Sequence, residues 1–304
     1  MAQTKMKKKG ANTSLVFTNK MYFFLIPALA FFLIFWIYPV LQLFYYSVTN
    51  FNGVNYDFDF VGMKNYIKVL NNGTLTNSMK NTLVYAVITV LLSNVVGLAV
   101  AMILNTKIRL KGLFRTCAYF PALFSAIVIG FIWSYVYMPG SGMIASILSM
   151  IGLDGAAFNP LGNYKTALYA IAIVEAWKAF GTTMIIYLAG LQTLDQSVME
   201  AASLDGASGW KKFWNITLPM LQPAFTTSVV LNLIGGLKLF DIIKVLTNGG
   251  PGYATNSIST YISSMYFDAQ NAGYASALGV FLFILIAIIT YLLNTGLAKL
   301  NWEA

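Results

Sequence analysis

Long apolar runs separated by short polar stretches make up most of this sequence. A helix needs about 20 apolar residues to cross a bilayer, and the chain contains six runs of about that length. The pattern therefore predicts an all-α membrane protein with six transmembrane helices, at about 22–46, 81–104, 116–137, 166–191, 223–246 and 274–297. Pro121 interrupts the third run, and a Gly-rich stretch with a short helix is expected at 139–165.

The first apolar run is predicted to remain in the mature chain. The apolar core of a signal peptide spans about 7–15 residues and ends at a small-residue cleavage site. The uncharged stretch at 21–56 is longer and has no such site. We expect a basic cytoplasmic tail at 1–20, the first transmembrane helix at 21–48, an outer loop at 49–76 and a cytoplasmic tail at 298–304.

The positions of lysine and arginine predict the orientation of the chain. Most of them lie in the first 20 residues, between Lys107 and Arg115, and at Lys211 and Lys212. Short loops rich in lysine and arginine stay in the cytoplasm. Both termini are therefore predicted to be cytoplasmic, with 49–76 and 247–273 outside.

Composition agrees with an integral membrane protein. Hydrophobic residues make up 58% of the chain and charged residues 10%, against about 25% charged in soluble domains. The absence of histidine and the single cysteine exclude histidine-based catalysis, zinc sites and an intrachain disulfide. The net charge of +9 does not indicate nucleic acid, because the basic residues lie beside apolar runs. No segment matches G-x-x-x-x-G-K-[ST], so this chain has no P-loop for ATP.

A polar interruption about two thirds of the way along the chain, at 199–223, predicts a pair of short helices. Thr193 and Gln196 have the spacing of a capping box, and Gly206 supplies a helix stop. A second helix is expected from about Ser208, with apolar side chains on one face and lysines on the other. Its apolar face consists of Trp210, Phe213 and Trp214. Such a pair is suited to the membrane interface and to docking into a groove on another protein.

Charged residues inside the apolar runs are candidates for a solute site, because they are costly in hydrocarbon unless they face a cavity or a partner. Glu175 and Lys178 are three residues apart, so they either pair with each other or face a solute. Trp177 either packs in the core or presents its ring to a sugar. In the fifth run a polar stripe is predicted, preceded by an amide and two glycines that serve either helix packing or a ligand. The stripe consists of Lys238, Asp241 and Lys244, and the residues before it are Asn232, Gly235 and Gly236.

Three segments resemble those of one transporter family. The first reads Glu200, Ala201, Ala202, Gly206, Ile216, Leu218 and Pro219 and resembles the EAA loop of ABC importer permeases. The heptad at 60–66 and the segment at 246–251 look like the FVG-x-x-NY and LT-x-GGP elements of carbohydrate permeases. The chain therefore resembles the maltose-type carbohydrate-uptake permeases. The resemblance implies the type I ABC importer permease fold with a cytoplasmic coupling helix, five helices of an ABC transmembrane domain at 77–297, and an EAA loop at about 193–222.

The resemblance also implies a role and a set of partners. The chain would be one permease subunit of an ATP-driven, binding-protein-dependent sugar or oligosaccharide importer in a bacterial cell membrane, and not itself an enzyme. Its partners would be a second homologous permease, two ATPase subunits that carry ATP and magnesium, and an extracytoplasmic solute-binding protein. Coupling to the ATPases would use Glu200, Ala201, Ala202, Asp205 and Gly206. The implied sugar path consists of Glu175, Trp177, Ala179, Thr182, Asn232, Gly235, Gly236, Lys238 and Leu239.

Two alternatives stay open at this point. Intramembrane lysines such as Lys178 and Lys238 favour an ABC importer for an anionic solute, such as a glycerol phosphate or a uronic oligosaccharide. An ion-coupled carrier or channel would need no ATPase at all.

Overall fold

The computed structural model describes residues 23–55 and 57–299, which form two compact units, one ending at Tyr45 and the other beginning at Tyr46. The predicted tail at 1–20 and the last five residues of the predicted tail at 298–304 lie outside the described part. In the first unit an apolar segment of 23 residues runs from Leu25 to Ser47 across the unit boundary. It consists of α2 (Leu25–Phe32), η1 (Leu33–Ile37) and α3 (Tyr38–Ser47). None of the residues of α2 and η1 is buried, so this span presents apolar side chains on every side.

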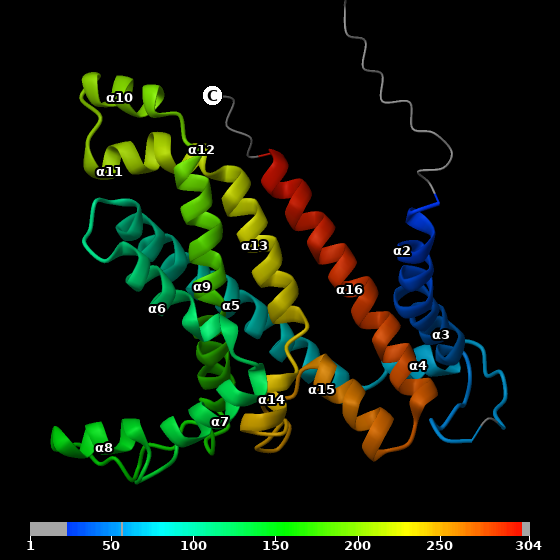
Figure 1. Cartoon of the computed structure of the whole chain (residues 1–304). Helices are drawn as coiled ribbons and strands as arrows, with labels where there is room; N and C mark the ends of the chain where they lie inside the picture. Colours follow the sequence, from blue (N-terminus) through cyan, green and yellow to red (C-terminus); the bar gives the residue numbers. More distant parts are fainter. Residues whose placement is uncertain (1–22, 56, 300–304) are drawn as a thin grey trace, which may run out of the picture. The chain divides into compact units, whose positions relative to one another are not determined.

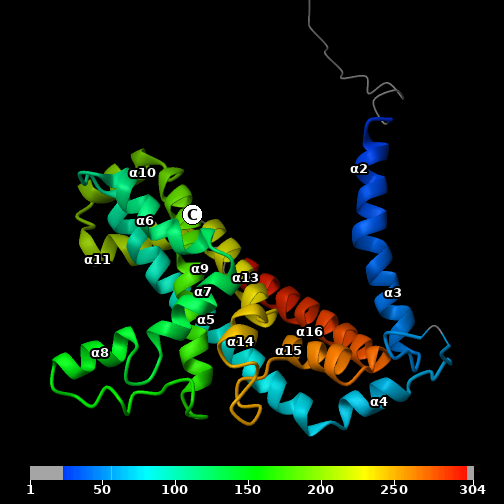
Figure 2. The same ribbon diagram turned by 60° about the horizontal axis from the view of Figure 1, so that its bottom comes forward.

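The second unit is helical, as predicted (Figures 1 and 2). The secondary structure of its described residues consists of helices, apart from one isolated β-bridge between Thr49 and Phe60. The helices are α4 (Lys64–Leu70), α5 (Gly73–Asn105), α6 (Lys111–Leu123), α7 (Ala126–Val136), α8 (Met143–Met150), α9 (Ala167–Gln192), α10 (Gln196–Leu204), α11 (Gly209–Lys212), η2 (Phe213–Thr217), α12 (Leu218–Met220), α13 (Gln222–Leu237), α14 (Asp241–Leu246), α15 (Ile258–Ser263), η3 (Ser264–Asp268) and α16 (Ala272–Lys299).

Among the described residues, four helices are long and apolar enough to cross a membrane, and six spans result if each of two bent pairs counts as one. The four are Leu25–Ser47, α5, α9 and the part of α16 up to Leu297. The bent pairs are α6 with α7, and the segment 209–220 with α13. This range includes the predicted number of spans.

Helix α5 lies at the centre of the unit, with α9 packed along it and α13 packed against both. It begins at Gly73, before the predicted start near 81, because the Asn72 side chain caps it by accepting a hydrogen bond of 2.8 Å from the Thr74 amide. Small residues let the neighbouring helices approach closely. A Cβ added to Gly97 of α5 would lie 2.6 Å from Cγ2 of Thr183 in α9. A Cβ added to Gly236 of α13 would lie 2.5 Å from the Ala86 Cα in α5.

The third predicted span is sharply bent. Pro121 is buried within α6, and the helix continues two residues past it. The break comes at Phe124 and Ser125, where the Ser125 hydroxyl caps the next helix by accepting a hydrogen bond of 3.3 Å from the Val128 amide. Helices α6 and α7 meet at 98°. Pro121 therefore lies just before the break, and the cap at Ser125 sets its position.

The prediction of one continuous fifth span at 223–246 is wrong. Helix α13 ends at Leu237, and α14 begins at Asp241. The Lys238 amide still bonds the carbonyls of the last turn, but Phe240 has φ −136° and ψ −62°, outside the helical region. Lys238 therefore lies in the break after α13, Asp241 begins α14, and the continuous polar stripe predicted through Lys244 does not form.

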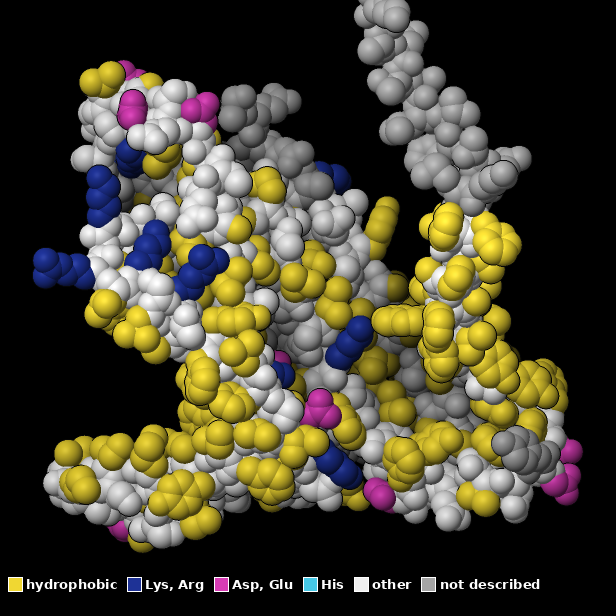
Figure 3. All heavy atoms as spheres, viewed as in Figure 1, with side chains coloured by type: hydrophobic (Ala, Val, Ile, Leu, Met, Phe, Trp, Pro, Cys, Tyr) yellow, Lys and Arg dark blue, Asp and Glu magenta, His cyan; other side chains and the backbone are white. Residues whose placement is uncertain are grey.

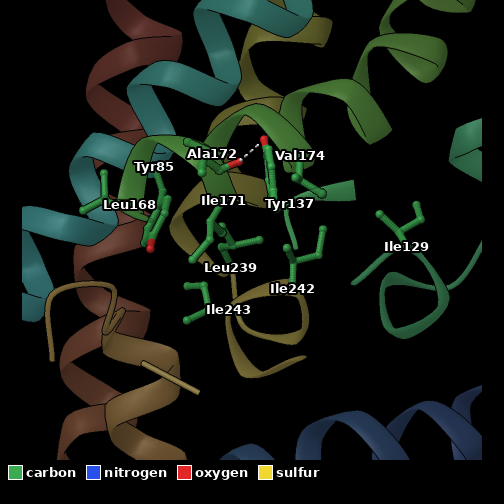
Figure 4. Close-up of a cluster of buried hydrophobic side chains, with 11 residues drawn as sticks. Tyr85, Ile129, Tyr137, Leu168, Ile171, Ala172, Val174, Leu239, Ile242 and Ile243 are labelled. Carbon is green, nitrogen blue, oxygen red and sulfur yellow. Dashed lines mark hydrogen bonds between the residues drawn. The ribbon is translucent and has the colours of Figure 1, made fainter. Parts of the chain in front are cut away.

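The predicted loop at 247–273 contains helix α15, which a capping box formed by Ser257 and Thr260 begins. A buried cluster joins α14 and the residues just before it to the central helices (Figure 4). It joins Tyr85 of α5, Ile171 and Val174 of α9, and Leu239, Ile242 and Ile243 around α14. All of these side chains except Leu239 are completely inaccessible to solvent. Helix α14 thus closes the space between α5 and α9 at the end of the unit opposite the α10–α11 pair (Figures 1 and 2).

The adjacent glycines Gly235 and Gly236 offer a matched test of this packing. Gly236→Ala would place a methyl group against the backbone of Ala86, and we expect it to lower the free energy of unfolding by about 1–3 kcal/mol. Gly235→Ala meets nothing within 4 Å, so the better helix propensity of alanine should leave stability unchanged or raise it. Thermal unfolding of the purified permease complex measures both variants. Equal stability of the two would contradict the close contact between α5 and α13.

Candidate functional site

The two short helices predicted at 199–223 form a helical hairpin, α10 and α11, at one end of the second unit (Figure 1). The predicted capping box of Thr193 and Gln196 is wrong. Asp195 caps α10 by accepting a hydrogen bond of 2.8 Å from the Ser197 amide. Hydrogen bonds from the Ser197 hydroxyl and amide lower the pKa of the Asp195 carboxyl. Thr193 instead ends α9, where its hydroxyl donates to the Gly190 carbonyl. Asp195 is the residue immediately before the helix, the position from which a carboxylate reaches the free amides of the first turn.

Gly206 ends α10 as predicted, in a left-handed conformation with φ +80°. Two backbone hydrogen bonds complete a Schellman motif, from the Ala207 amide to the Ala202 carbonyl and from the Gly206 amide to the Ser203 carbonyl. A Cβ at Gly206 would meet nothing within 4 Å. The need for glycine here is therefore conformational and not steric.

Lys212 ties the two helices of the hairpin together. Its Nζ donates hydrogen bonds of 2.7 Å to the Met199 carbonyl and 2.8 Å to the Ser203 Oγ, both on α10. Sequence reasoning placed this lysine on an exposed face and missed the contact. Two further side chains of the hairpin, Glu200 and Trp210, are exposed. Glu200 accepts a hydrogen bond of 2.9 Å from Gln196, while Trp210 is 72% exposed.

The aromatic side chains after the hairpin turn gather as predicted. The ring centroid of Trp210 lies 5.4 Å from that of Phe213 and 5.5 Å from that of Trp214. Of the five predicted coupling residues, Glu200, Ala201, Asp205 and Gly206 are exposed and Ala202 is buried. The hairpin therefore presents one acidic and small-residue surface on α10 and one aromatic surface on α11 and η2.

A cavity of about 210 Å³ lies between α5, α6, α9 and α13. Five residues of the predicted sugar path line it, namely Glu175, Ala179, Thr182, Asn232 and Gly235. Lys178 lines it too, beside Glu175. The structure thus brings together polar side chains from two helices that are far apart in sequence. We call this space the inner cavity.

The other four predicted path residues lie outside the inner cavity. Trp177 is packed edge-on against Trp133, with 5.5 Å between the ring centroids, which favours the packing interpretation. Gly236 is in contact with α5, Lys238 is exposed at the end of α13, and Leu239 is buried in the cluster of Figure 4. The break after Leu237 accounts for the last two, because it turns the chain away from the axis of α13.

Two polar side chains in the wall of the inner cavity, Asn232 and Thr89, differ in their hydrogen bonding. Asn232 donates hydrogen bonds of 2.8 Å to Thr183 Oγ1, which joins α13 to α9, and of 2.9 Å to the Ser228 carbonyl within α13, so both of its amide hydrogens are used. Thr89 also lines the cavity, and its buried hydroxyl has no hydrogen-bond partner among the described residues. A buried hydroxyl of this kind is normally satisfied by water or a ligand. Sequence reasoning missed Thr89, although Ser78, Thr82, Thr89 and Ser93 recur at helical spacing along α5.

Comparisons with known proteins agree on one family. Residues 93–300 match the family described as binding-protein-dependent transport system inner membrane component. The chain is 34% identical to the multiple sugar-binding transport system permease protein of Streptococcus mutans, over 88% of this chain and 92% of that protein. It is 35% identical to the trehalose/maltose transport system permease protein of Thermococcus litoralis, over 88% and 90%. It is 31% identical to the sn-glycerol-3-phosphate transport system permease protein of Agrobacterium fabrum, over 91% and 94%.

A solved structure has the same fold. The chain superimposes on a subunit of a bacterial ABC transporter that imports the acidic polysaccharide alginate, with a TM-score of 0.79, 24% identity, and coverage of 92% of this chain and 95% of that one. The expected type I ABC importer permease fold is therefore confirmed.

The Lys212 contact can be tested against its neighbour. Lys212→Met removes both hydrogen bonds, and a loss of about 1 kcal/mol should speed amide exchange across 196–212 roughly five-fold. Lys211→Met changes an exposed ammonium on the same helix and should leave exchange as in the wild type. Hydrogen–deuterium exchange of the intact complex measures this difference. The same exchange rate in both variants would show that Lys212 does not hold the hairpin together.

Proposed function

Because this chain belongs to the binding-protein-dependent transport system inner membrane component family, we propose that it forms half of the translocation path of an ATP-driven sugar or oligosaccharide importer. The sugar permeases of Streptococcus mutans and Thermococcus litoralis, aligned over most of their length, support a carbohydrate substrate. The permease itself performs no covalent chemistry in this proposal.

One geometric observation carries the mechanism. Helix α9 leads into the hairpin and α13 follows it, and these two helices supply most of the lining of the inner cavity. A displacement of the hairpin must therefore move the helices that shape the cavity. This connection suits alternating access, in which ATP-driven closure of two partner ATPases turns the cavity from inward to outward facing.

The hairpin would be the coupling element that docks on an ATPase subunit. Its exposed Glu200 suits a basic partner, and the small side chains of α10 allow a close approach. ATP and magnesium would be held by the ATPases. A second, homologous permease would complete the path, and an extracytoplasmic binding protein would deliver the solute.

The charge distribution supports a cytoplasmic hairpin. Basic side chains gather over α6 and α11, at the hairpin end of the unit (Figure 3). Positive charge favours the cytoplasmic side of a bacterial membrane. We therefore place the hairpin and both termini in the cytoplasm, with α14 and α15 on the outer side.

A second substrate class is favoured by one observation. Lys178 places an ammonium group in the wall of the inner cavity, and the glycerol phosphate permease of Agrobacterium fabrum is a relative of this chain. An anionic solute, such as a glycerol phosphate or a uronic oligosaccharide, is therefore the alternative to a neutral sugar.

Coupling is tested by Glu200→Lys and Gly206→Val in the reconstituted complex. Charge reversal should repel a basic partner, and valine at φ +80° should distort the turn at a cost of about 1–2 kcal/mol or more. We expect uptake to fall ten-fold or more, while the complex still assembles and solute no longer stimulates ATP hydrolysis. Asp57→Lys, an exposed charge reversal outside the hairpin, is the control. Normal stimulated hydrolysis and uptake in both hairpin variants would exclude this coupling role.

The two substrate classes are separated by Lys178→Met. This change removes the ammonium and keeps much of the side-chain length. If the solute is anionic, uptake of glycerol 3-phosphate or trigalacturonate should fall about ten-fold, equivalent to about 1.4 kcal/mol, with maltotetraose uptake unchanged. Lys64→Met on α4 is the control. An equal fall for neutral and acidic solutes would instead assign Lys178 to the structure of the cavity wall.

A further inference from the structure

A second and larger cavity lies at the end of the unit opposite the hairpin, and the proposed function assigns it no role. It has a volume of about 670 Å³ and lies between the start of α5, the segment before α9 and the loop at 247–257. Its lining includes Tyr164, Tyr169, Tyr253, Asn77, Asn81 and Lys165. We call it the outer vestibule. Its lining contains three tyrosines, two amides and one cation, and no carboxylate.

The loop that forms one wall of the vestibule is fixed to helix α5. Asn81 donates hydrogen bonds of 3.0 Å to the Ala254 carbonyl and 2.9 Å to the Asn256 carbonyl. The Tyr85 hydroxyl donates one of 2.9 Å to the Thr255 carbonyl. Three consecutive carbonyls of the loop are thus held by side chains of one helix, so the loop has little freedom to collapse into the cavity.

Tyr253 lies on this fixed loop in an unfavourable conformation. Its φ is +65°, which costs a non-glycine residue about 1–2 kcal/mol. Its side chain is nevertheless 68% exposed, so core packing does not explain the strain. Tyr253 also lines a neighbouring cavity of about 620 Å³ that contains Lys244 and Asp268. Strain that the surroundings maintain is characteristic of ligand-contacting residues. The loop therefore holds an aromatic ring at the junction of two outer cavities.

The chemistry of the vestibule matches a saccharide. Aromatic faces pack against the apolar face of a ring, and amides bond hydroxyl groups. Exposed tyrosines come from two further positions, Tyr164 before α9 and Tyr169 on it. We propose that the outer vestibule is a saccharide-binding station in which Tyr253 and Tyr169 stack on sugar rings and Asn77 bonds hydroxyls. This inference rests on the proposed function of the chain.

The vestibule and the inner cavity are separate in this structure. Tyr169 lines the first and Glu175 the second, and their positions on α9 are six residues, or about 9 Å, apart. Between them lie Ile171 and Val174, fully buried in the cluster shown in Figure 4. A saccharide in the vestibule would therefore wait outside the hydrophobic cluster, so the vestibule is a first station on the path.

Direct occupancy is tested by cysteine protection. The lone native cysteine is removed by Cys117→Ser, and single cysteines are placed by Tyr253→Cys or, on a regular helix, Tyr169→Cys. A membrane-impermeant maleimide is applied to the complex in nanodiscs without binding protein, with maltotetraose, raffinose or trigalacturonate as the probe. We expect at least one probe to slow labelling at both positions five-fold or more. Leu153→Cys, which is exposed outside the vestibule, should be labelled at an unchanged rate.

Protection by none of the probes would overturn the proposal. In uptake assays Tyr253→Ala should reduce the rate at limiting saccharide about five-fold, whereas Tyr266→Ala, a tyrosine outside the vestibule, should not. If Tyr253→Ala only raises the amount of binding protein needed, and no probe protects, the surface docks that protein instead. If the complex takes up no saccharide but the cysteines are protected, the proposed function fails and the station remains.

Discussion

The close packing of α9 and α13 on α5 is the constraint on which the rest of the second unit depends. Gly97 and Gly236 allow two helices to approach the α5 region at distances that a Cβ would prevent. Gly235, the residue before Gly236, instead lines the inner cavity, and a Cβ there would meet nothing within 4 Å. The two glycines therefore differ in role: Gly236 allows the close contact with α5, and Gly235 lies in the cavity wall.

The hairpin depends on this packing in turn. Its two flanking helices are held to each other by Asn232, which bonds Thr183 across the interface at 2.8 Å. Lys212 and the turn at Gly206 hold the hairpin helices together. A force applied at α10 therefore acts on a connected body that includes the wall of the cavity. Rigidity at the hairpin and polarity in the cavity serve the same conformational change in the proposed mechanism.

Much of this could be predicted from local sequence. The length and apolarity of each run predicted the spans, and Gly206 after Asp205 predicted the turn, because both signals lie within one continuous stretch of sequence. The break between α13 and α14 could not be predicted, because the run at 223–246 contains no proline near the break and the side chains that fix the break are distant. Ser257, for example, donates a hydrogen bond of 2.8 Å to the Leu239 carbonyl across 18 residues. The orientation of Trp177 depends likewise on Trp133, in another helix.

The two cavities differ in charge in a way that bears on the solute. The inner cavity is lined by both Glu175 and Lys178, so an anionic solute there meets a carboxyl group as well as an ammonium group. The vestibule contains Lys165 without an acid in its lining. An anionic saccharide would therefore gain more electrostatic attraction in the outer vestibule than in the inner cavity. A neutral saccharide would depend on hydroxyl and aromatic contacts in both cavities. Thr89 offers an unpartnered hydroxyl in the inner cavity, and Tyr253 offers an exposed ring in the outer vestibule. The outer vestibule therefore favours acidic solutes, and the inner cavity accepts both acidic and neutral ones.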